Sequence, residues 1–399
     1  MVRGRLLIFQ EKYYNASMIL CENSYRKIIP IASGKGGVGK TVLAANLGIA
    51  LGRAGFRTIL VDLDLGGSNL HSVLGIKNKF PGIGNFISGK TLSFKEIILR
   101  TEYPNLFFVP GDVLVPGSAD INYIQRKRVV DNLLKLETDY ILLDLGSGTH
   151  ASTLDFFLSS NAGLLVAIPQ VPSILNTYSF LKNALFRLLT RFFSKEKEIS
   201  EYLKSLQKET QPNSIPAAGK ILIEIERMNP EACSNARQIL QAFKPHLIVN
   251  MAKHPDDLAI VESLRNLVQK NLEIPFGCLG IVFRDDQVHE SIEQMRPLLQ
   301  MAPESLVSKQ ISRMAEKILQ SKNFPDLPLD LSEYKDSFEL AEIEAHYDLA
   351  ETSNAESAKK QEEALTPEEF LTVLTAQQKK INELQGTIRM LTLRGRQET

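Results

Sequence analysis

The stretch KIIPIASGKGGVGKT, residues 27–41, decides the fold of this 399-residue chain. Residues 27–32 form a short apolar run that predicts a buried strand, and residues 40–54 have the apolar spacing of a helix. The residues between them match the pattern Gly-x4-Gly-Lys-Ser/Thr. A glycine-rich turn between a strand and a helix lets successive backbone N–H groups, and the positive end of the helix, point at an anion. The sequence therefore predicts a phosphate-binding loop that holds a nucleoside triphosphate.

Individual positions of this loop have expected roles. Lys40 is expected to lie against the β- and γ-phosphates, and the Thr41 hydroxyl is expected to bind Mg²⁺. A glycine turn with no ligand is the alternative, but a chance match to the pattern is improbable in a chain of this length. The backbone expected to surround the phosphates belongs to Gly34, Gly36, Gly37, Val38 and Gly39.

The composition sets broad limits. Lys and Arg number 46, as do Asp and Glu, so net charge gives no argument for bulk attraction to nucleic acid or to an anionic membrane. Cys21, Cys233 and Cys278 are far apart and form no Cys-x-x-Cys pair, which gives no support for a zinc or iron–sulfur site and fits a reducing cytoplasm. No apolar run approaches the ~18–20 residues that span a bilayer. We expect a cytoplasmic protein, and association with the inner face of the membrane stays open.

Further apolar runs define the fold class. They are continuous rather than alternating, and helical segments separate them, which indicates an α/β fold with a doubly wound parallel sheet covered on both faces. Because the carboxyl ends of parallel strands share one edge, the loops that follow these strands should converge on the phosphate-binding loop. The expected strands after the first are residues 58–62, 105–110, 139–144, 163–169, 246–250 and 276–282.

Acidic residues end two of these strands. Asp144 closes an apolar run and is expected to organise Mg²⁺ through its water shell. Asp62 and Asp64 face the same side of an extended chain. We expect Asp64 to orient the attacking water and Asp62 to steady the metal or the loop. Gly148, in the turn after Asp144, could offer its backbone N–H to a γ-phosphate. A strand-end Asp that only caps the next helix is the alternative for Asp144.

Three segments together carry a family resemblance. KGGVGKT, residues 35–41, resembles the deviant Walker A motif of the MinD/ParA family of P-loop ATPases. VDLDLGGSNL, residues 61–70, resembles the segment after the second strand of that family, and LDLGSG, residues 143–148, resembles its Walker B and switch II. The resemblance spans about residues 27–320 and is nearest to the FlhG-like and MinD-like branch.

The resemblance implies a mechanism. Members of the family hydrolyse ATP with Mg²⁺. The extra lysine, here Lys35, reaches the partner's nucleotide in an ATP-sandwiched homodimer. Lys40 and Thr41 act on the nucleotide of their own subunit. Asn250 matches the position that reads adenine. The resemblance also places Arg284 and Asp285 where a loop packs on the base, although Phe283 stands where the family has Pro.

The function implied is an ATP-dependent dimerisation switch that positions a cellular structure of flagellar or cell-division type, with an activating protein partner. A DNA-partition ATPase is the main alternative, and an iron–sulfur carrier ATPase, which needs paired cysteines, is a weaker one. Residues 326–370 contain fourteen acidic residues and three lysines, so the rest of this neutral chain is mildly basic, which permits DNA binding. The membrane-anchoring helix of MinD and the activator motif of FlhG are not recognisable.

The expected domain organisation has four parts. Residues 1–26 carry no pattern that we can assign. Residues 27–322 form the ATPase domain, with a helical elaboration at about 180–244. Its first helix is apolar, and its basic residues at four-residue intervals, Arg187, Arg191 and Lys195, predict a stripe that faces solvent. We expect residues 323–366 to be an acidic linker and residues 367–395 to be an amphipathic helix.

Overall fold

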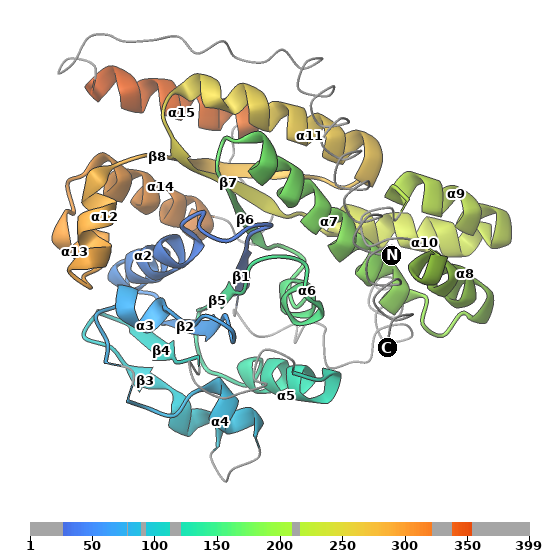
Figure 1. Cartoon of the computed structure of the whole chain (residues 1–399), viewed down its shortest axis with the longest axis horizontal. Coiled ribbons are helices and arrows are strands. Elements are labelled where there is room, and N and C mark those ends of the chain that lie inside the picture. The colour runs from blue at the N-terminus through green and yellow to red at the C-terminus, as the bar shows by residue number, and fades with distance from the viewer. Residues whose placement is uncertain are drawn as a thin grey trace, which may run out of the picture.

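A computed structural model describes residues 27–77, 79–88, 93–111, 121–209, 216–320 and 337–352. Its centre is an eight-stranded sheet in the order β3-β4-β2-β5-β1-β6-β7-β8 (Figure 1). Neighbouring strands run parallel except for β3 and β4. The strands are β1 Lys27–Ala32, β2 Thr58–Leu63, β3 Leu99–Arg100, β4 Leu106–Val109, β5 Tyr140–Leu145, β6 Leu164–Ala167, β7 His246–Ala252 and β8 Gly277–Phe283. The predicted doubly wound parallel sheet is confirmed.

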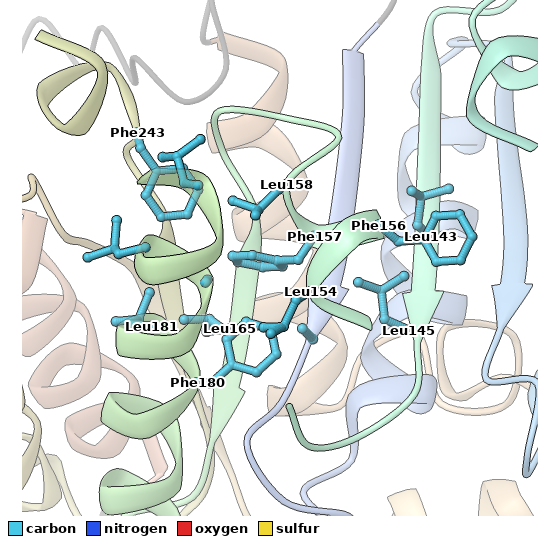
Figure 2. Packing of buried hydrophobic residues seen from close by; sticks show 14 of the residues in the cluster. Leu143, Leu145, Leu154, Phe156, Phe157, Leu158, Leu165, Phe180, Leu181 and Phe243 are labelled. Atoms are coloured by element: carbon cyan, nitrogen blue, oxygen red, sulfur yellow. The ribbon is translucent and has the colours of Figure 1, made fainter. Parts of the chain in front are cut away.

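Helices cover both faces of the sheet. Along β5, Leu142 packs in the core with α2 and α14, whereas Leu143 and Leu145 pack in the second core with α6 and α7. Figure 2 shows the aromatic and leucine side chains of α6 and α7 lying over β5 and β6 in this second core. The helices are α2 Lys40–Arg53, α3 Leu70–Val73, α4 Ile83–Ile87, η2 Phe94–Ile97, α5 Tyr123–Leu133, α6 Ala151–Phe157, α7 Val171–Phe192, α8 Lys197–Glu209, α9 Ala218–Met228, α10 Pro230–Ala242, η3 Pro255–Asp257, α11 Leu258–Leu272, α12 Asp286–Glu293, α13 Leu298–Met301, α14 Leu306–Gln320 and α15 Ser337–Thr352.

The region of the expected helical elaboration contains the C-terminal part of α7 together with α8, α9 and α10. These helices lie at one end of the molecule, beyond the sheet (Figure 1). Helix α7 begins at Val171, before the expected start of the elaboration at about residue 180, and Pro172 lies in its first turn, where proline is well tolerated. The long apolar face of α7 therefore spans both the sheet and the elaboration.

The expectation of an acidic linker is wrong for part of its length, because residues 337–352 form α15, which packs against β8. Two of its acidic side chains are paired with α14: Arg313 Nη2 lies 2.6 Å from Asp348 Oδ1, and Lys317 Nζ lies 2.7 Å from Glu344 Oε2. The linker was predicted from the many acidic residues alone. The same stretch also contains apolar residues at helical spacing that are buried, namely Phe338, Ala341 and Ala345. The expected extension 1–26 and terminal helix 367–395 lie outside the described residues.

The predicted solvent-facing basic stripe is also wrong for its two members on α7, whereas the third, Lys195, lies beyond the end of that helix. Arg187 and Arg191 both form ion pairs with Asp155 of α6, which is only 3% exposed. Arg126 of α5 completes the group, with Nε 2.7 Å from Asp155 Oδ2. Lys195 is exposed, as expected. One buried carboxylate therefore joins three helices on one face of the sheet.

Asp155→Asn should lower the free energy of unfolding by about 3–5 kcal/mol, because it leaves partly buried arginines without their counter-ion. Urea unfolding followed by circular dichroism measures the loss. The matched control is Asp131→Asn, which removes the partner of Lys127 in a more exposed pair on α5 and should cost no more than about 0.5 kcal/mol. Equal losses in the two variants would contradict the role given to Asp155.

Candidate phosphate-binding site

The loop between β1 and α2 has a backbone that requires glycine at several points. Gly37 and Gly39 have φ values of 79° and 81°, in the left-handed region that side chains rarely adopt. A Cβ on Gly34 would clash with the backbone of Asn176 in α7, and a Cβ on Gly39 would clash with the side chain of Asn250. The loop is thus closely confined by α7 on one side and by the end of β7 on the other, as a cradle for an anion requires.

Lys40 opens α2 and turns into the site. Its Nζ lies 2.5 Å from Asp144 Oδ1, and these side chains are 7% and 1% exposed. The Thr41 side chain also lies close enough to Asp144 to oppose the rise in the pKa of that carboxyl. Because β2 and β5 are adjacent and in register, Asp62 lies directly opposite Asp144. The first two residues of α2 and two strand ends therefore meet at one point.

Burial strongly affects the carboxyl groups. The pKa of Asp62 is raised to about 7, chiefly by desolvation and then by the negative charge of Asp144, although hydrogen bonds oppose this. Desolvation also raises the pKa of Asp144, while Lys40 acts in the opposite direction and Asp64 adds to the rise. Oxygen donors with such a surplus of buried negative charge suit a hard divalent cation. Thr41, Asp62 and Asp144 are the residues that could hold it.

The turn after β5 touches the phosphate-binding loop. The N–H of Gly148 donates to the carbonyl oxygen of Ser33 at 3.0 Å. Ser147 lies close to Gly36: a Cβ atom added to this glycine would be 3.5 Å from Ser147 Oγ. The Ser33 hydroxyl is buried and has no hydrogen-bond partner within the described part of the chain. A buried orphan hydroxyl next to a glycine-rich loop fits a site whose remaining hydrogen bonds go to a ligand.

The residues assigned by resemblance occupy three different settings. Lys35 is exposed on the loop. Asn250 is buried, and its Nδ2 donates to the carbonyl oxygen of Val38 at 2.8 Å, so the structure brings it to the phosphate-binding loop itself. Arg284 is exposed at the end of β8. Asp285 caps α12, because its carboxylate accepts the N–H of Gln287.

Some residues of the site were given no role by the sequence. The Ser68 hydroxyl donates to Asp62 Oδ2 at 2.6 Å and so fixes that carboxylate. The sequence signal for this role was the position of Ser68, six residues after Asp62 in a loop that returns to the end of the same strand. Met251 also lies near the loop, since its Cε would be 3.5 Å from a Cβ added to Gly39, and the local sequence gave no signal for it.

Asp62→Asn should change how the stability of the nucleotide-free protein depends on pH. The pKa of Asp62 is 3.8 ordinarily and about 7 in the folded protein, so between these values the folded state keeps a proton that the unfolded chain releases. Its contribution to stability is therefore present below about pH 4 and is lost as pH rises through about 7. The variant should lose less stability than wild type over this range, by up to ~1.4 kcal/mol per pH unit. Parallel curves from urea unfolding would contradict this.

Comparison with known proteins shows which family this chain resembles. The family model for the CobQ/CobB/MinD/ParA nucleotide binding domain matches residues 29–298. The flagellum site-determining protein YlxH of Helicobacter pylori is 34% identical over 161 residues, which cover 39% of this chain and 53% of that protein. The septum site-determining protein MinD of Thermotoga maritima is 31% identical over 148 residues, which cover 37% and 54%. The chain spans about half the length of these curated relatives.

A solved structure agrees at the level of the fold. The cell division ATPase MinD from Pyrococcus furiosus aligns with a TM-score of 0.50 and 22% identity, covering 74% of this chain and 98% of that one. Among the described residues, no helix is long and apolar enough to cross a membrane. The family model covers more than half of this chain, and the chain therefore belongs to the CobQ/CobB/MinD/ParA nucleotide-binding family.

Proposed function

We propose that this chain is an ATP-binding and ATP-hydrolysing dimerisation switch that positions a cellular structure of flagellar or cell-division type. The observation that carries the proposal is the contrast between two lysines of one loop. Lys40 is buried and paired with Asp144, whereas Lys35 is exposed on the loop. One lysine thus serves the nucleotide of its own subunit, and the other is free to reach the nucleotide of a second copy.

The proposed chemistry needs no covalent intermediate. Thr41, Asp62 and Asp144 would hold Mg²⁺, which neutralises charge on the phosphates when it is bound. Lys40 would turn from Asp144 to the β- and γ-phosphates. Asp64, which lies near Asp144, would accept a hydrogen bond from the attacking water, and ADP and phosphate would result. Gly148 would release Ser33 and donate its N–H to the γ-phosphate, so the loop after β5 would respond to hydrolysis.

The named relatives support the cellular role. YlxH is described as flagellum site-determining and MinD as septum site-determining, and each matches this chain at over 30% identity in a shared segment. The homodimer, an activating protein partner, and a cytoplasmic location with peripheral attachment to a membrane surface belong to the same proposal.

Lys35→Ala should abolish ATP-dependent dimerisation and leave the monomer folded and able to bind ATP, because an exposed loop lysine contributes no core contact. Light scattering coupled to size-exclusion chromatography, with ATP and Mg²⁺, measures the oligomer. Lys220→Ala, at an exposed lysine on α9, is the matched control and should dimerise normally. A Lys35→Ala dimer as stable as wild type would refute the role of Lys35 across the interface.

Asp64→Asn should retain the ATP-dependent dimer and slow hydrolysis by about 10²-fold or more, because the attacking water loses its hydrogen-bond acceptor. Phosphate release, measured at saturating ATP, tests the rate, and chromatography with ATP tests the dimer. The dimer should also last longer than that of wild type. Hydrolysis at the wild-type rate would remove Asp64 from the proposed mechanism.

A DNA-partition ATPase is the second candidate, and the mildly basic body of the chain favours it. DNA binding that requires ATP and weakens steeply with salt would support this alternative over the flagellar or division role. An iron–sulfur carrier is a weaker candidate, because Cys233 and Cys278 are buried in α10 and β8. An iron-containing preparation would favour it.

A further inference from the structure

We infer that Thr153 of α6 is a second hydrogen-bond partner for the water that attacks the γ-phosphate, opposite Asp64 and across Gly146. The inference rests on the proposed function, since it takes the reaction to be hydrolysis of a nucleoside triphosphate. Neither the motifs nor the resemblance gave Thr153 a role. The observation that carries it concerns Gly146, the first residue after β5.

Gly146 is a glycine that neither backbone conformation nor close packing demands. Its φ lies outside the left-handed region, whereas Gly148, two residues later, has a φ of 82°. A Cβ on Gly163 would stand 2.2 Å from the ring of Phe157, so packing requires glycine there, but at Gly146 the nearest atom would be 3.3 Å away. Glycine at position 146 therefore provides space at the end of β5.

Two oxygen atoms from different elements border this space. The point where a Cβ of Gly146 would stand is 3.3 Å from Asp64 Oδ1 and 3.6 Å from Thr153 Oγ1. Hydrogen bonds between oxygen atoms extend to about 3.0 Å, so small shifts of the two side chains bring one water within reach of both. A carboxylate and a hydroxyl on two sides of one point form a site that fits a single water molecule.

The core beneath Thr153 fixes its position. Thr153 is the third residue of α6 and is 6% exposed, and its neighbour Leu154 packs in the second core (Figure 2). The hydroxyls of Thr177 and Thr190 in α7 donate to the carbonyl oxygens four residues before them. The Thr153 hydroxyl forms no such bond within the described part of the chain, because the residue four positions earlier precedes α6. Its hydroxyl borders the space at Gly146 instead.

The space lies where the proposed reaction needs a water. Gly146 stands between Asp144, which is proposed to hold the metal ion, and Gly148, whose N–H is proposed to bind the γ-phosphate. One proton of the water would bond to Asp64 Oδ1 and the other to Thr153 Oγ1, which leaves a lone pair free to attack phosphorus. The water oxygen bonds to the γ-phosphorus as the bond to the β,γ-bridging oxygen breaks. ADP leaves with that electron pair, and both protons of the water stay with the phosphate.

Thr153→Val tests the inference, because valine has nearly the same shape as threonine and lacks the hydroxyl. Phosphate release at saturating Mg²⁺ and ATP should be about 3- to 10-fold slower, the range expected for one neutral hydrogen bond. The affinity for a non-hydrolysable ATP analogue, measured by calorimetry, and the ATP-dependent dimer should stay as in wild type, because the hydroxyl binds the water and not the nucleotide. Thr153→Ser, which keeps the hydroxyl, should hydrolyse ATP within about twofold of the wild-type rate.

Gly146→Ala tests the space itself, since its methyl group would stand where the water is expected. Phosphate release should slow at least as much as in Thr153→Val, with unchanged affinity for the analogue. The double variant Asp64→Asn/Thr153→Val should be slowed by less than the product of the two single effects, because both residues act on one water. A crystal structure of wild type with Mg²⁺ and the analogue should show a water bonded to Asp64 Oδ1 and Thr153 Oγ1.

Thr190→Val is the matched control. It removes a hydroxyl that donates to the Phe186 carbonyl near the C-terminal end of α7, and it should leave rate and affinity unchanged. The inference is overturned if Thr153→Val hydrolyses ATP as wild type does or loses affinity for the analogue, if Thr153→Ser is equally slow, or if the effects at Asp64 and Thr153 multiply fully. Each of these outcomes leaves the proposed function intact. Wild-type protein that hydrolyses no ATP overturns the proposed function, and the inference falls with it.

Discussion

The site depends on one buried ion pair between the helix that follows β1 and the end of β5. Lys40 and Asp144 are almost fully buried. Either charge, buried without the other, would lower the free energy of unfolding. The pair can form only because β1 and β5 are neighbours and the chain turns through a glycine loop directly into α2. Removal of either partner would leave an unpaired charge where a triphosphate is expected to bind.

The same pair explains why the site is poised for ligand exchange. Asp62 and Asp64 add negative charge around Asp144, so one lysine faces more carboxylate than it can neutralise. Protonation of Asp62 near neutral pH lessens this surplus in the nucleotide-free protein. With Asp62 ionised, Thr41, Asp62 and Asp144 could together hold a divalent cation, and Lys40 would then be available to an anion. The arrangement is therefore more favourable to a metal–phosphate complex than to either component alone.

Much of this could be predicted from the sequence, because the signals are local. The phosphate-binding loop is a contiguous motif, and the main strands are continuous apolar runs. Strand β3 was missed because two residues leave no periodic pattern. The basic residues of α7 seemed to face solvent because their partner, Asp155, lies 32 positions before Arg187. Strand β7 also has a bulge at Asn250 and Met251 that depends on pairing with β8, which no single segment encodes.

The error at α15 shows how local charge can mislead. The acidic stretch has the composition of a solvated linker, but Glu344 and Asp348 face basic side chains of α14 across the end of the sheet. Gln310 of α14 joins the two layers: it accepts the N–H of Phe283 at the end of β8 and donates to Asp348. Because β8 is the edge strand, α15 covers apolar surface that would otherwise invite association. Residues beyond the matched family domain, which ends at 298, thus complete the fold at the β8 edge of the sheet.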